Sequence, residues 1–482
     1  MDLFRPSPSV HLSNPGSANA MNQTAPAVKA PSTRLSLKHY LGYGLGDFAF
    51  NFYWLPLQVF LLKYYTDVLG LSSDAAGLIV MICLIWDGLV DPYVGILASR
   101  TRSRFGRYRP YMLYGSVPLA ISFSLVFLPV PFEQTALIVY ALATQLLFRS
   151  VYAAVNIPYG AMMASMTRDS MERNNLAGVR MLFAFGGSAI VGYFTPRLVA
   201  WFGVDHPDSA HFLSAALLSS IATIVLFLSF AGTEERVDDD AHASSNVKLW
   251  PMLKMISRNV PFMQASAAIA LFGVASTATS ASLAYYVEYV LHKDATVTGN
   301  LISMIPLVQM LAILPWTWFS RRIGKRWAWI LGLLIAIVSV LVLFAWKTVD
   351  QTALTILIGL SAFGCASIAV NFWSIVPDTV EYGEWQSGVR AEGFVFGLVT
   401  LIQKTALGLA NAFVGMYLTW IGYVPNQAQT EEAQRGLLHL ITVVPAVAML
   451  ASCAVMIFYR LNTKRHAEIV RQIAERRQVA TA

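Results

Sequence analysis

The sequence predicts an all-α membrane protein, with twelve transmembrane helices in two six-helix halves related by a parallel repeat. Three observations support this fold class: the composition, the recurrence of long apolar stretches, and short motifs that occur once in each half. Of the 482 residues, 56% are hydrophobic and 13% are charged, and the mean hydropathy is +0.55. Soluble domains contain about 25% charged residues. The composition therefore indicates a chain that buries its apolar surface largely in lipid.

Apolar stretches long enough to cross a bilayer as helices recur along the whole chain. We count twelve, with centres near residues 54, 86, 120, 150, 187, 220, 274, 307, 337, 364, 405 and 446. The longest polar interruption divides six spans from six. We therefore expect a disordered cytoplasmic tail (1–37), an N-terminal half (38–231), a cytoplasmic linker (232–258), a C-terminal half (259–462) and a basic cytoplasmic tail (463–482).

Internal repetition supports the division into halves. Three pairs of short motifs recur in the same order and at a nearly constant offset. The pairs are Tyr64-Tyr65 with Tyr285-Tyr286, Arg104-x-Gly106-Arg107 with Arg322-x-Gly324-Lys325, and Val155-Asn156 with Val370-Asn371. Parallel halves of this kind hold a substrate site between them, near the middle of the membrane.

The basic residues predict the orientation of the chain. They cluster in the tails and the even-numbered junctions between spans, whereas the odd-numbered junctions carry Lys293, Lys347 and Arg435. Both termini should therefore be cytoplasmic. The net charge of +7 follows from this topology and does not indicate a nucleic-acid partner. The three cysteines lie in apolar stretches without metal-ligand spacing, so neither a bound metal nor a cofactor is expected.

Two aspartates, Asp87 and Asp91, lie in the middle of the second span, in the sequence IVMICLIWDGLVDPYVGIL. One ionisable residue at the centre of a membrane helix costs ~2.5–3.5 kcal/mol. Residues four apart share a helical face, and close carboxylates tend to share a proton or to bind a cation. We interpret the pair as the site of a coupling cation or proton. The alternative is a structural ion pair with a base on a neighbouring helix.

Four more charged residues lie within predicted spans: Asp47, Arg149, Arg180 and Lys404. Together with the aspartate pair they make three acids against three bases, which predicts pairing across a hydrated cavity. Asp47 could accept hydrogen bonds from sugar hydroxyls, and Arg180 or Lys404 could attract an anionic substrate group. Helix packing for Asp47, permanent salt bridges for Arg180 and Lys404, and a structural role for Arg149 remain open.

Further candidates for the substrate site are a polar residue, Asn156, and three aromatic residues, Trp54, Tyr159 and Trp373. Aromatic rings stack well on the C–H faces of pyranoses, although most membrane aromatics serve packing or the interface. A basic loop and an acidic segment could close a cytoplasmic gate, because opposite charges on two elements form breakable latches. The gate candidates are Arg102, Arg104, Arg107, Asp378, Glu381, Glu384 and Arg390. For the arginines, the alternative is the ordinary positive charge of inside loops.

Five stretches of the chain resemble the glycoside–pentoside–hexuronide:cation symporters, a branch of the major facilitator superfamily. They are YYTDVLGL, IWDGLVDPYVG, TRSRFGRYRPY, VNIPYG and DTVEYGEWQSGVRAEG, and the resemblance extends over about residues 39–465. It implies the major facilitator fold and uptake of sugars or glycosides with H⁺, Na⁺ or Li⁺ through a bacterial inner membrane. The VNIPYG and DTVEYGE stretches are most similar to those of glucuronide carriers.

The resemblance also implies roles for single residues. Asp87 and Asp91 match the cation-site acids of the family, and Asp47 matches its sugar-contacting acid. Arg180 and Lys404 match functional basic positions, and Asn156 stands where melibiose carriers have aspartate.

Three departures from the family pattern concern the ion. Sodium-using melibiose carriers have asparagine where this chain has Val90, and threonine where it has Ala153, so two oxygen ligands for a hard cation are missing. This favours H⁺ over Na⁺. Many members carry an arginine where this chain has Leu84, and Arg149 could supply that charge as a partner of the acids.

We therefore expect a monomeric proton-coupled symporter for glucuronides, pentosides or related glycosides that works by alternating access. The alternatives are a drug or lipid carrier on the same scaffold and a sugar sensor that binds without net flux. An enzyme is not expected, because no nucleophile–base pair stands out.

Overall fold

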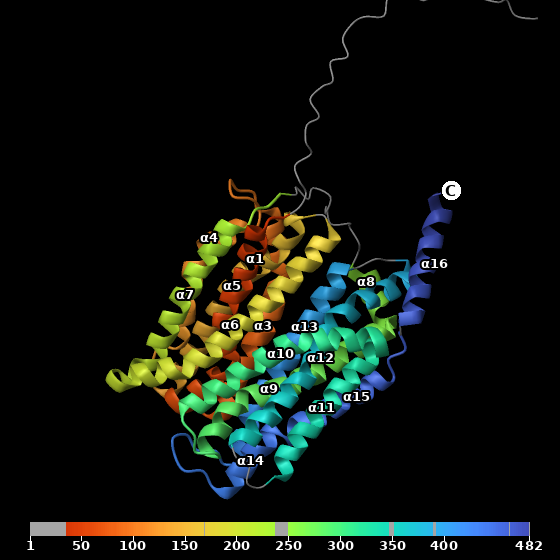
Figure 1. Cartoon of the computed structure of the whole chain (residues 1–482). Helices are drawn as coiled ribbons and strands as arrows, with labels where there is room; N and C mark the ends of the chain where they lie inside the picture. The colour runs from red at the N-terminus through yellow and green to blue at the C-terminus, as the bar shows by residue number, and fades with distance from the viewer. Residues whose placement is uncertain are drawn as a thin grey trace, which may run out of the picture. The chain divides into compact units, whose positions relative to one another are not determined.

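A computed structural model describes residues 35–167, 169–236, 249–346, 351–388, 392–461 and 463–481. Every regular element in these ranges is a helix (Figure 1). The predicted tail up to residue 34, most of the loop in the predicted linker (237–248) and Arg390 lie outside the described residues.

Six long helices form the N-terminal half. They are α1 (Leu37–Val59), α3 (Ser73–Arg100), α4 (Arg109–Val126), α5 (Gln134–Met166), α6 (Ser170–Asp205) and α7 (Ala210–Gly232). Short helical segments extend α1 and precede α7: α2 (Leu61–Lys63), the π-helical η1 (Tyr64–Val68) and the 3₁₀ segment η2 (Pro207–Ser209).

The C-terminal half repeats this plan with its last span broken in two at Thr442. Its spans are α9 (Val260–Tyr289), α10 (Ala295–Ile323), α11 (Lys325–Ala345), α12 (Gln351–Ser387), α13 (Glu392–Trp420), and α14 (Glu431–Ile441) with α15 (Val443–Ile457). Two further helices flank these spans, α8 (Leu249–Arg258) and α16 (Thr463–Thr481). Each of the twelve predicted span centres lies inside one of these helices. Within the described ranges, ten helical segments are long and apolar enough to cross a membrane; α1 and α4 fall outside that criterion and pack along them.

The two halves meet along two helix pairs, α3 with α13 and α6 with α10. Glycines allow the first pair to approach closely: a Cβ atom on Gly415 of α13 would lie 2.2 Å from the carbonyl oxygen of Ser73, and one on Gly77 of α3 would lie 2.7 Å from that of Asn411. Only a residue without a side chain fits at such a crossing. This contact brings the polar residues in the middle of α3 against those of α13.

Because successive spans run in opposite directions, the connections gather at two ends of the helix bundle. We call the end that contains η1 the Asp67 end, and the opposite end, where α3 stops and α4 begins, the Glu235 end. The helix α16 packs on α12 at the Glu235 end, with Ile469 and Ile473 buried and the Trp385 indole donating a 2.7 Å hydrogen bond to Gln472. The expected basic tail is thus largely an ordered helix.

Candidate substrate and ion site

The aspartate pair of α3 lies in a buried cluster of four charges that joins the halves. The Lys404 Nζ of α13 lies 2.9 Å from Asp87 Oδ2 and 2.5 Å from Asp91 Oδ2. The Arg149 Nη1 of α5 lies 3.5 Å from Asp87 Oδ2. The Asp87 side chain is fully buried, and the Asp91 and Lys404 side chains are 12% and 16% exposed. Two acids therefore face two bases in a region of low dielectric constant.

Hydrogen bonding within this cluster is incomplete. Lys404 donates its hydrogen bond to Asp91, so its approach to Asp87 is an ion-pair contact. Among the described residues, neither oxygen of Asp87, nor Asp91 Oδ1, nor Arg149 Nε and Nη1 has a hydrogen-bond partner. Buried polar atoms without partners are rare in proteins and mark strained or functional positions. Asp87 and Asp91 therefore both present unpartnered carboxylate oxygens to which a proton could bind.

A second ion pair, between Asp47 of α1 and Arg180 of α6, lies within the N-terminal half. Arg180 donates to both carboxylate oxygens, with Nη2 3.1 Å from Oδ1, and its guanidinium lies over the rings of Tyr43 and Tyr159, 5.4 and 5.2 Å from their centroids. The Tyr159 hydroxyl lies 2.8 Å from Asp47 Oδ2 and 2.5 Å from the Tyr43 carbonyl oxygen. Because a hydroxyl carries one proton, it can donate to only one of these two oxygens at a time. Gly46 makes this possible, because a Cβ there would lie 2.2 Å from the Tyr159 ring.

The remaining predicted substrate residues are placed differently. Trp54 lies beneath Arg149, with its ring centroid 5.6 Å from the guanidinium carbon. Asn156 is half-buried, and its side chain forms no hydrogen bond with another described residue. Trp373 is 47% exposed and stacks on Phe396 at 6.4 Å. The structure thus gathers Asp47, Arg180 and Tyr159 in one cluster, whereas Lys404 and Trp54 belong with the acids of α3.

Two of the predicted gate acids make contacts within the C-terminal half. Asp378 accepts a 2.6 Å hydrogen bond from Lys325, and Glu381 pairs with His466 of α16. On the N-terminal half, Glu235 accepts hydrogen bonds from the backbone N–H groups of Arg107, Tyr108 and Arg109 at 2.8, 2.8 and 3.0 Å.

In the described ranges, Arg102 and Arg104 form no ion pair with the acids of α12, on which Glu384 is half-buried. The role of the two elements in gating therefore remains a prediction.

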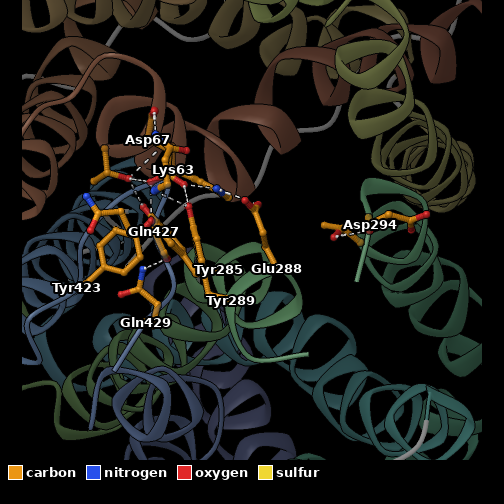
Figure 2. Close-up of polar contacts among 12 residues, drawn as sticks. Lys63, Asp67, Tyr285, Glu288, Tyr289, Asp294, Tyr423, Gln427 and Gln429 are labelled. Atoms are coloured by element: carbon orange, nitrogen blue, oxygen red, sulfur yellow. Dashed lines mark hydrogen bonds and ion pairs between the residues drawn. The ribbon is translucent and has the colours of Figure 1, made fainter. Parts of the chain in front are cut away.

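A third polar cluster, whose members were not among the predicted site residues, joins the halves at the Asp67 end (Figure 2). The Asp67 carboxylate accepts hydrogen bonds from Tyr289 and Tyr423 at 2.7 and 2.6 Å and forms an ion pair with Lys63. Lys63 also lies 3.0 Å from Glu288. The sequence signal was a lysine and an aspartate four residues apart at the end of an apolar span.

A cavity of about 460 Å³ adjoins this third cluster. Its wall combines aromatic rings of the N-terminal half with charged residues of both halves. They include Phe60, Phe123, Phe127, Lys63, Glu288 and Asp294.

The fold and the buried charges define a membrane carrier of the major facilitator type, and comparison with known proteins agrees. The chain matches the family described as MFS/sugar transport protein over residues 42–463. It is 30% identical to the isoprimeverose transporter of Lactiplantibacillus pentosus, over 92% of this chain and 93% of that protein. It is also 30% identical to the glucuronide carrier protein homolog of Escherichia coli, over 92% and 97% of the two chains.

Among solved structures, one of proton-dependent oligopeptide transporters matches with a TM-score of 0.66 at 11% identity, over 90% of this chain and 99% of that one, which shows a shared fold. The chain belongs to the MFS/sugar transport family. The predicted resemblance and the predicted fold are therefore confirmed. The relatives are named as transporters, so this chain is a multi-pass membrane transporter and not an enzyme.

Proposed function

We propose that this chain is a proton-coupled glycoside symporter that works by alternating access in a bacterial inner membrane, with both termini in the cytoplasm. The observation that carries the proposal is the buried cluster of Asp87, Asp91, Lys404 and Arg149 between the halves. A transporter couples two solutes when binding of one changes the free energy of binding the other or of rearranging the halves. A cluster of four charges with unsatisfied oxygens supplies such a response to a single proton.

In the proposed cycle, one aspartate of α3 takes up the proton. The paired charges Asp87, Asp91, Lys404 and Arg149 are balanced before this step, so one added proton leaves a single excess positive charge in the cluster. Lys404 then needs only one carboxylate partner and is freer to move with α13, which changes how the halves meet. The absence of an oxygen ligand at Val90 and Ala153 supports a proton over Na⁺ as the coupling ion.

The glycoside would bind between the halves near the Asp47–Arg180 pair. Hydroxyl groups of a sugar can accept from Arg180 and donate to Asp47, whose side chains are 28% and 15% exposed. A glucuronide would direct its carboxylate toward Arg180 or Lys404. The names of the isoprimeverose and glucuronide relatives support a pentoside or a hexuronide as the solute.

Uptake into proteoliposomes under imposed gradients tests this function. Labelled glucuronide, xyloside and galactoside would be offered with acid outside, with sodium outside at equal pH, or with neither. We expect accumulation driven by acid. Accumulation driven by sodium alone would contradict the ion assignment, and equilibration without accumulation would contradict symport.

A double substitution, Asp87→Asn with Asp91→Asn, tests the cluster itself. The amides keep the size of the side chains but cannot release a proton, so accumulation should vanish while the protein still reaches the membrane. The matched control is Asp74→Asn, the same chemical change at the start of the same helix. Undiminished accumulation by the double variant would remove the cluster from the coupling mechanism.

A further inference from the structure

We propose that the Asp67 carboxylate is the latch that holds the Asp67 end closed, and that the halves separate at this end when its hydrogen bonds to the C-terminal half break. The inference rests on the proposed alternating access, and nothing in the predicted cation or substrate sites requires it. The Asp67 side chain is 5% exposed and lies at the boundary between the halves, where Figure 2 shows side chains from both converging on it.

The carboxylate of Asp67 is saturated with donors. Oδ1 accepts from Thr66 at 2.7 Å and from Tyr423 at 2.6 Å, and Oδ2 accepts from Tyr289 at 2.7 Å and from Lys63. An ionised carboxylate offers about four acceptor sites, and here all four are filled. Hydrogen bonds to a charged acceptor are about twice as strong as neutral ones, so this single group stabilises several contacts at once.

Half of these donors come from the other half of the molecule. Tyr289 lies at the end of α9, and Tyr423 lies in the turn that follows α13. The same turn contributes Asn426, whose side chain donates a 2.7 Å hydrogen bond to the backbone carbonyl of Asp67. Asn426 has a φ of 57°, a left-handed conformation that a non-glycine residue adopts at some cost. The turn therefore has an uncommon backbone conformation at the residue that donates a hydrogen bond to Asp67.

Two further contacts cross the boundary beside the carboxylate. The Thr66 hydroxyl lies 2.9 Å from the Tyr285 hydroxyl, so Tyr285 can donate to Thr66 while Thr66 donates to Asp67. Lys63 lies 3.0 Å from Glu288, and it lies over the rings of Tyr285 and Tyr289 at 5.5 and 5.0 Å. Three tyrosine hydroxyls of the C-terminal half thus converge on one carboxylate, directly or through Thr66.

The local backbone and the protonation of the donors suit this role. Asp67 lies within the π-helical turn Tyr64–Val68 and Lys63 directly precedes it, and π-turns occur frequently at functional sites. Burial raises the pKa of Tyr423, and the neighbouring Asp67 raises it further, so Tyr423 remains a hydroxyl donor throughout the neutral range. The cavity of about 460 Å³ beside the latch is lined by both halves, so its shape must change when they separate at this end.

Pairs of spin labels measure the opening directly. Labels at Gln134→Cys and Glu432→Cys lie on exposed residues at the Asp67 end of the two halves, in a background from which the three native cysteines have been removed. The distance distribution is recorded without glycoside, so it does not depend on which solute or ion is transported. We expect a single short distance in the parent protein. In Asp67→Asn, the population at longer distance should rise by about tenfold or more, because one hydrogen bond to a charged group is worth a factor of that order.

Two sets of variants control this experiment. Asp74→Asn makes the same chemical change at the same end but outside the cluster, and should leave the distribution unchanged. The pair Tyr289→Phe and Tyr423→Phe removes only the two hydroxyls from the other half, and should reproduce the opening even where Asp67→Asn fails to fold. An unchanged distribution in the folded Asp67 variant or in the double phenylalanine variant would overturn the latch, as would equal opening in Asp74→Asn.

Discussion

The pairing of buried charges in the middle of the bundle determines how strongly the substitution of a single residue affects the protein. Asp87 is fully buried and has two cationic neighbours, Lys404 at 2.9 Å and Arg149 at 3.5 Å. Removing one partner of a buried ion pair is expensive, because the remaining charge keeps its desolvation penalty without the compensating attraction. We therefore expect Arg149 to contribute both to stability and to transport, since it is a near neighbour of the candidate proton acceptor.

Arg149→Ala should impair both folding and transport. We expect the free energy of unfolding to fall by up to about 3 kcal/mol, since Lys404 continues to compensate Asp87 in part. Proton-driven uptake should be strongly reduced. Leu84→Arg, one turn before Asp87 on α3 and itself buried, should restore part of both quantities in the Arg149→Ala background. Thermal unfolding and proteoliposome uptake measure the two effects, and normal values for the single variant would show that Arg149 is dispensable.

Sequence reasoning at this scale identified the charged residues and predicted Arg149 as a partner of the span 2 acids, but it did not assign partners to the other charges. Asp87 and Asp91 are recognisable because two acids interrupt an apolar span. The pairing of Lys404 with them depends on how α13 packs against α3, and no spacing in the sequence encodes that contact between residues 313 positions apart. Asp67 was missed for a related reason, because its donors Tyr289 and Tyr423 lie in the other half and look like ordinary interface aromatics.

At the scale of helices, close packing of α3 on α13 positions the whole ion cluster. The two helices touch where Gly77 and Gly415 face each other, and a methyl group at Gly415 would overlap the Ser73 carbonyl. Separation of the helices there would move Lys404 relative to the acids. The glycine contact is therefore a determinant of the geometry of the ion site, although it lies toward the Asp67 end of both helices.

Gly415→Ala should destabilise the protein and disturb coupling. Inserting a methyl group into a filled contact costs about 1–3 kcal/mol. The matched control is Gly397→Ala on the same helix, where a Cβ would meet no atom within 4 Å and the substitution should be neutral or stabilising. Thermal unfolding compares the two variants. Equal behaviour would show that the helices do not need this close approach.

Helix positions were predictable because hydropathy alone reports which segments are long and apolar. Every predicted span centre lies inside a helix, from α1 near residue 54 to α15 near residue 446. The π-turn at Tyr64–Val68 and the break at Thr442 were not predicted, because hydropathy does not distinguish a π-turn or a helix break from continuous α-helix. Burial of Ile469 and Ile473 was missed because α16 has few apolar residues and looks like a charged tail.

Taken as a whole, the described bundle is bridged by hydrogen bonds at the Asp67 end, whereas two predicted gate acids at the Glu235 end have partners within the C-terminal half. Among these residues, Asp378 pairs with Lys325 and Glu381 with His466, all in the C-terminal half. If both termini are cytoplasmic, as the distribution of lysine and arginine predicts, the bridged Asp67 end faces outward, and we predict that this state opens toward the cytoplasm. The proposed substrate site near Asp47 and Arg180 should then be reached from the cytoplasmic side.

A cysteine at Asn156 tests this state. A charged thiol reagent should label Asn156→Cys faster in inside-out membrane vesicles than in right-side-out vesicles, because the latched end blocks access from outside. Glu432→Cys, exposed at the Asp67 end, should show the reverse preference and so report the orientation of the vesicles. Faster labelling of both positions from one and the same side would contradict the assignment of the closed end.

The Asp47–Arg180 pair has a consequence for turnover. Both groups already satisfy each other, so a sugar that binds there, as we propose, would gain only the difference between its own contacts and the ones it displaces. When the sugar dissociates, Asp47 and Arg180 would pair with each other again, so no unpaired charge would remain to attract the ligand. Because the two charges compensate each other in the empty site, the site would bind sugar weakly and release it rapidly. This suits a transporter, which must release its solute on the other side of the membrane.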